Sequence, residues 1–166
     1  MKKENIAITL DTEVQFSLTK KWTSVIEKHN QRASYESEYG HERFAHAAIG
    51  KQYVPNEKGV YRMSFLELLY VTREIFLCAG CRSEFEGAIV TFFTDDGPVE
   101  LQINEHVAFD PADIVVNAIQ EREPWFERSK DGLCRNSFWA TINYMRPFVA
   151  VLGKHAFRSD KVILNV

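Results

Sequence analysis

Two cysteines separated by two residues, Cys78-Ala-Gly-Cys81, have the spacing best suited to chemistry. Such a pair can exchange with disulfides or supply two ligands to zinc. Redox-active pairs usually lie at a helix N-terminus, whose dipole favours the thiolate, whereas this pair falls at the end of a predicted helix. A structural zinc site needs a second close pair of ligands, and Cys134 has no such partner. We therefore predict inert cysteines and no cofactor.

A second group of chemically capable residues combines carboxylates with one histidine: Asp95, Asp96, Glu100, Glu105 and His106. Converging carboxylates hold divalent ions in nucleases and phosphatases. Local structure explains the same residues, because aspartates are typical of turns and outward strand positions are typically polar. A small metal-dependent hydrolase therefore stays an alternative, and we predict no metal site.

Other catalytic patterns are absent from the sequence. His41 and His46 are five residues apart, which places them on different faces of a helix. The chain has no Gly-rich phosphate-binding loop and no Gly-x-Ser-x-Gly motif. We predict that the protein is not an enzyme.

Charge is distributed very unevenly along the chain. The segment Ser83–Glu121 contains no Lys or Arg and has a formal charge of −9, whereas the whole chain has −3. A concentrated negative field selects positively charged partners and accelerates their association. We predict that the protein binds a basic protein through acidic residues, with one tryptophan as an apolar anchor: Asp95, Asp96, Glu100, Glu105, Asp113 and Trp125.

Composition limits the class of protein. With 166 residues, 45% of them hydrophobic, the chain suits a single globular domain spanning residues 1–166. No apolar run approaches the roughly 18 residues that cross a bilayer, no signal peptide is recognisable, and an odd number of cysteines argues against a secreted disulfide framework. A pI of about 6.0 is untypical of nucleic-acid-binding domains. We predict a cytoplasmic protein without membrane or nucleic-acid partners, and no particular oligomeric state.

The elements that would position these residues indicate an α+β fold, with a small antiparallel or mixed sheet packed against several helices. Strands are predicted over residues 6–10, 59–63, 85–94, 99–107 and 161–166, with a hairpin at Asp95-Asp96-Gly97. Helices are predicted over 12–29, 35–49, 64–79, 111–123 and 138–152. Ser64 and Glu67 form a capping box for the third helix, and Asp110 is the predicted cap of the fourth. For the helix predicted over 12–29 a hairpin remains the alternative, because Val14, Phe16 and Leu18 are apolar at alternating positions.

The stretch Phe85–Leu152 runs strand, acidic turn, strand, Asp-Pro-capped helix and then a helix that begins Ser137-Phe138-Trp139. This order resembles small immunity proteins of bacterial contact-dependent growth-inhibition systems. The resemblance implies a non-catalytic cytoplasmic inhibitor that neutralises a cognate toxin, commonly a basic nuclease. The alternatives are an anti-defence inhibitor from a phage or mobile element, a structural or assembly protein, and the hydrolase named above.

Overall fold

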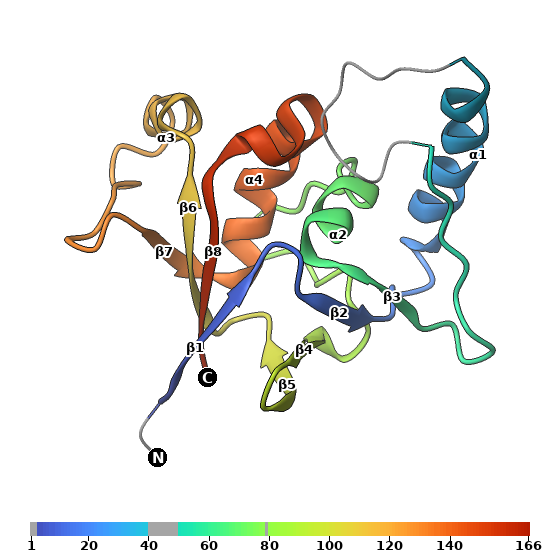
Figure 1. Ribbon diagram of the computed structural model, residues 1–166, viewed down its shortest axis with the longest axis horizontal. Helices are drawn as coiled ribbons and strands as arrows, with labels where there is room; N and C mark the ends of the chain where they lie inside the picture. The colour runs from blue at the N-terminus through green and yellow to red at the C-terminus, as the bar shows by residue number, and fades with distance from the viewer. Residues whose placement is uncertain (1–2, 40–49, 79) are drawn as a thin grey trace.

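The computed structural model describes residues 3–39, 50–78 and 80–166 and has two four-stranded antiparallel sheets (Figure 1). The first sheet has the order β1-β8-β6-β7, formed by Asn5–Thr9, Phe157–Asn165, His106–Pro111 and Cys134–Ser137. The second has the order β3-β2-β4-β5, formed by Tyr61–Ser64, Glu13–Phe16, Ile89–Thr94 and Gly97–Gln102. β1 and β8 join the two ends of the described chain, because Glu4 and Val166 exchange backbone hydrogen bonds of 2.7 and 3.0 Å.

Four α-helices accompany the sheets in the described part of the chain: α1 (Thr23–Tyr39), α2 (Phe65–Val71), α3 (Asp113–Gln120) and α4 (Phe138–Leu152). Two 3-10 turns, η1 (Glu86–Ala88) and η2 (Gly153–Ala156), precede β4 and β8. α4 packs against α2, β6 and β7 at the centre of the molecule (Figure 1). The fold is α+β, as the sequence predicts. No helix in the described ranges combines the length and apolar character needed to cross a membrane.

A cluster of phenylalanines joins the two sheets into one core. The Phe65 ring, at the start of α2, lies 5.4 Å from Phe92 of β4, 5.5 Å from Phe109 of β6 and 5.8 Å from Phe138 of α4. All four side chains are completely buried. Burial of aromatic side chains contributes several kilocalories per mole, so this contact fixes the sheets relative to each other.

The chain passes directly from the second sheet to the first between β5 and β6. The predicted single strand over 99–107 is therefore wrong, because residues 103–105 form a turn between two strands. The Glu105 carboxylate accepts the backbone N–H of Gln102 at 2.8 Å and stabilises this turn. The backbone N–H groups of Phe138 and Trp139 donate to the Glu105 and Ile103 carbonyls at 2.8 and 2.9 Å, which attaches the turn to the start of α4.

The predicted helix over 12–29 is wrong in its first half. Val14 and Phe16 are buried from β2, where Val14 pairs with Met63 of β3 and Phe92 of β4. Tertiary pairing thus favours the strand alternative, and the helix α1 begins only at Thr23. Of the helix predicted over 35–49, residues 35–39 belong to α1 and residues 40–49 lie outside the described residues, as do His41 and His46.

The strand predicted over 85–94 begins only at Ile89. Residues 86–88 form η1, in which Gly87 has φ 67° and Ala88 has φ 55°, and this left-handed backbone interrupts the strand. The two faces of β4 are covered unequally. Val90 and Phe92 are buried, whereas the alternating residues on the other face are partly exposed.

Two predicted helix boundaries are also wrong. The capping box of Ser64 and Glu67 is confirmed, but α2 ends at Val71 instead of residue 79. Asp110 does not cap α3: Asp110 and Pro111 complete β6, and Ala112 is the capping residue. Both corrections involve arginines that are distant in the sequence. Arg146 contacts Thr72 just after α2. Arg128 and Arg158 contact Asp110.

Candidate protein-binding surface

The carboxylates of Ser83–Glu121 divide into a neutralised group and an exposed group. Three of them, Glu84, Asp110 and Asp113, form ion pairs with arginines that follow the acidic segment in the sequence. Three others, Asp95, Asp96 and Glu100, are exposed on the β4–β5 hairpin and form no ion pair within the described residues. We call these three residues the acidic hairpin.

Glu84 lies in a buried network centred on Arg146 of α4. Both side chains are completely buried, and an Nη of Arg146 donates to Glu84 Oε1. The guanidinium also donates to Thr72 Oγ1 at 3.1 Å and Asn143 Oδ1 at 2.7 Å. Burial lowers the pKa of Arg146, and the Glu84 carboxylate opposes this effect. The network explains the end of α2, because it engages Thr72 and, at 3.5 Å, the Ile75 carbonyl.

Asp110 is the centre of a second neutralised cluster. Arg128 Nη1 and Arg158 Nε lie 3.2 and 2.9 Å from its Oδ1, and Ser159 Oγ donates to its Oδ2 at 2.5 Å. Arg128 also donates to the Asp113 carboxylate at 2.7 Å. These contacts attach the loop after α3 and strand β8 to β6, so Asp110 is a structural residue.

The acidic hairpin owes its shape to a two-residue turn. Thr94 pairs with Gly97, so Asp95 and Asp96 form the loop, and Gly97 adopts φ 115°, which only glycine readily tolerates. Thr94 Oγ1 donates to the Gly97 carbonyl at 2.7 Å and closes the turn. The predicted hairpin at this site is confirmed.

Glu100 extends the negative surface along β5, which is an edge strand of its sheet. Glu100 pairs with Thr91 of β4 and is exposed, whereas its neighbour Leu101 is buried in the core. Beside the turn, Asp95 helps to line a hollow of about 280 Å³ together with Phe93, Thr9 and Thr12. The Thr12 and Thr9 hydroxyls already accept the backbone N–H groups of Thr9 and Asp11 at 3.0 and 3.2 Å, so the Asp95 carboxylate is the acceptor that this hollow offers to an entering group.

The other predicted contact residues do not belong to the same surface. Glu105 is half-buried and holds the turn between β5 and β6. Asp113 belongs to α3 and is paired with Arg128; α3 lies at the upper left of Figure 1, away from the hairpin at the bottom. Trp125 is 54% exposed, donates from its indole N–H to Glu123 at 2.7 Å, and packs against Tyr144. The acidic segment therefore does not form one continuous face.

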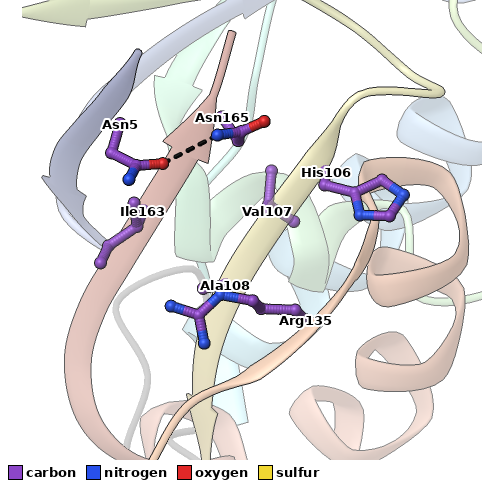
Figure 2. Close-up of a pocket in the computed structure, with 7 residues that line it drawn as sticks. All are labelled: Asn5, His106, Val107, Ala108, Arg135, Ile163 and Asn165. Atoms are coloured by element: carbon purple, nitrogen blue, oxygen red, sulfur yellow. Dashed lines mark hydrogen bonds between the residues drawn. The ribbon is translucent and has the colours of Figure 1, made fainter. Parts of the chain in front are cut away.

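A different hollow lies on the open face of the first sheet, next to His106. Figure 2 shows the residues that line it, which include Arg135 of β7, Asn5 and Asn165. The Asn165 side-chain amide donates to Asn5 Oδ1 at 2.8 Å. Arg135 forms a bidentate ion pair with Asp131, which lowers the pKa of Asp131 and raises that of Arg135. The Asp131 carboxylate thus neutralises the Arg135 guanidinium at this hollow.

The residues predicted for a metal-dependent hydrolase lie in two different sheets. His106 belongs to β6 in the first sheet, whereas Asp95, Asp96 and Glu100 belong to the hairpin of the second. Over residues 3–39, 50–78 and 80–166 no three histidine, cysteine or acidic side chains form a group suited to a metal ion. Cys78 and Cys81 are exposed and Cys134 is buried.

Arg146 is completely buried in the core, and no motif in the sequence predicts its role. One signal was present, since Arg146 is the only charged residue among the fifteen of α4. A lone charge in an apolar helix predicts a buried partner. The sequence could not identify that partner, because Glu84 is 62 positions away.

Comparison with known proteins finds no protein family, no curated protein and no solved structure that matches the chain significantly.

Proposed function

We propose that this protein is a non-catalytic inhibitor that binds a basic protein through the acidic hairpin, as an immunity protein does when it neutralises a nuclease-type toxin in the cytoplasm. The observation that carries this proposal is the exposed trio Asp95, Asp96 and Glu100. These carboxylates lie on one hairpin and have no ion-pair partner in the described part of the chain, while Glu84, Asp110 and Asp113 are matched.

Electrostatics supports a basic partner. A nuclease attracts a polyanion, so its substrate cleft carries Lys and Arg side chains. The acidic hairpin competes for the same field and accelerates the encounter of the two proteins. In this arrangement the hollow beside Asp95 receives one lysine or arginine of the partner, because it offers the Asp95 carboxylate.

The experiment measures binding to the basic toxin domain that we predict to be encoded next to the gene of this protein, and it compares the natural protein with the double variant Asp95→Lys/Glu100→Lys. We expect the association rate, measured by surface plasmon resonance at low salt, to fall about tenfold or more, because reversed charges repel a basic cleft. Rescue of bacterial growth by co-expression should weaken in parallel.

The control is Glu121→Lys/Glu127→Lys, which changes the net charge equally at two exposed positions outside the hairpin. Steering by net charge alone would slow both variants alike. Equal association rates for the hairpin variant, the control and the natural protein would remove the acidic hairpin from the interface.

A further inference from the structure

Cys78 and Cys81 face each other across a tight turn on the surface. Their Sγ atoms are 2.9 Å apart, and both side chains are exposed. The Cys81 backbone N–H donates to the Cys78 carbonyl at 3.1 Å. Gly80 lies between them with φ 86°, where a side chain would strain the backbone. The backbone thus holds the two thiols together.

The segments on both sides of this turn are attached to α4. Before the turn, Leu77 is buried and its carbonyl lies 3.5 Å from Asn143 Nδ2. After the turn, Glu84 is buried against Arg146, which also reaches the Ile75 carbonyl. Because both segments are fixed, the cysteines keep their separation without help from a helix. The helix-dipole argument for inert thiols does not apply, since α2 ends at Val71.

The two thiols are chemically unequal. A hydrogen bond from the Cys78 thiol, with further help from the Cys78 backbone and Lys21, lowers the pKa of Cys81. The same hydrogen bond raises the pKa of Cys78. Cys81 is therefore the better nucleophile, and Cys78 is placed to attack a sulfur bound to it.

We propose that Cys78 and Cys81 form a reversible redox site that exchanges electrons with a small disulfide such as glutathione disulfide. The Cys81 thiolate attacks one sulfur of the disulfide, forms a mixed disulfide and releases one glutathione thiolate. Cys78 then loses its proton, attacks the Cys81 sulfur and releases the second glutathione. The protein dithiol is oxidised by two electrons to a Cys78–Cys81 disulfide, and one glutathione disulfide is reduced to two glutathione molecules.

Access to the site is open. Cys78 lines a hollow of about 230 Å³ whose apolar walls include Phe76 and Trp139. Phe76 is 68% exposed, whereas its neighbour Leu77 is buried. Cys134 is buried on β7 and, by contrast, cannot readily meet a solution disulfide.

The experiment treats the reduced full chain with glutathione disulfide and counts free thiols by alkylation and mass spectrometry. We expect the three thiols to fall to one, with a loss of two hydrogens, no bound glutathione and full reversal by dithiothreitol. The control Cys134→Ser should lose both of its thiols at the rate of the natural protein, because Cys134 takes no part.

Single variants test the second, resolving attack. Cys78→Ser should accumulate glutathione on Cys81, because no second thiol resolves the mixed disulfide. Cys81→Ser should likewise retain glutathione on Cys78, because no second thiol resolves that mixed disulfide. Gly80→Val should slow ring closure several-fold through strain at φ 86°. Three retained thiols in excess glutathione disulfide, or only dimers linked through Cys78 or Cys81, would overturn the proposal.

Discussion

Glu84 and Asp95 belong to the same acidic segment, yet their surroundings are opposite. Glu84 is completely buried against Arg146, whereas Asp95 is exposed at a hairpin tip beside an open hollow. A buried charge must be matched, so Glu84 acts on the stability of the fold. An exposed, unpaired charge has little effect on folding and is available to a partner. Net charge alone does not distinguish Glu84, which is structural, from Asp95, which is exposed and available to a partner.

Substitution of the buried Glu84 should lower the free energy of unfolding more than any other change considered. Glu84→Gln should lower the free energy of unfolding by about 3–5 kcal/mol, because it leaves the buried Arg146 guanidinium without a counter-charge. Urea denaturation followed by far-ultraviolet circular dichroism measures the loss. The double variant Glu84→Met/Arg146→Met should lose less than Glu84→Gln, because no buried charge remains. A double variant that is less stable than the single one would show that the charges themselves stabilise the fold.

A smaller effect is expected at the second neutralised cluster. Asp110→Asn should lower the free energy of unfolding by about 1–3 kcal/mol, because Arg128 and Arg158 lose their shared carboxylate. Asp113→Asn is the matched control and should change it by less than about 1 kcal/mol, since the Asp113 side chain is 78% exposed. Equal losses in chemical denaturation would contradict the assignment of Asp110 as the structural member of the pair.

Substitution of the exposed carboxylates Asp95 and Glu100 should have almost no effect on the free energy of unfolding. Asp95→Lys/Glu100→Lys should change the free energy of unfolding by no more than about 0.5 kcal/mol, because neither carboxylate has an ion pair in the described residues. Urea denaturation of the variant used in the binding experiment tests this directly. A loss comparable to that of Glu84→Gln would mean that the acidic hairpin is structural.

A still smaller effect is expected on the pH dependence of stability, through the ion pair of Asp131 and Arg135. Arg135 holds the pKa of Asp131 below its usual range. The ion pair therefore stabilises the fold above the unfolded pKa of about 4, and this contribution is lost as pH falls below that value towards the folded pKa. Asp131→Asn should narrow the difference between the urea midpoints at pH 7 and pH 3. An unchanged difference would show that the pair contributes no measurable stability.

Local features of the fold could be predicted from the sequence, whereas features that depend on distant partners could not. The Ser64 and Glu67 capping box, the Asp-Gly turn and the apolar stripe of α4 involve residues within a few positions of each other, and all three are present. The end of α2 depends on Arg146, which lies 74 positions beyond Thr72. Periodicity over residues 64–79 carries no information about that contact.

The candidate site shows the same limit. The exposed position of Asp95, Asp96 and Glu100 follows from the alternation of the hairpin, and the sequence indicated it. The neutralisation of Asp110 does not, because Arg128 and Arg158 reach it only through the pairing of β6 with β8. An aspartate before a proline is a typical helix cap, and tertiary pairing overrode that local preference.

The pairing of β1 with β8 also constrains how the chain can be assembled. Asn5 pairs with Asn165, so the first strand has no partner until nearly all of the described chain has been synthesised. Closing so long a loop is entropically costly and makes such contacts late in folding. Until then, Ile6 and Ile8 remain on an unpaired strand that can associate with other chains, and chaperones that shield it should raise the yield of folded protein.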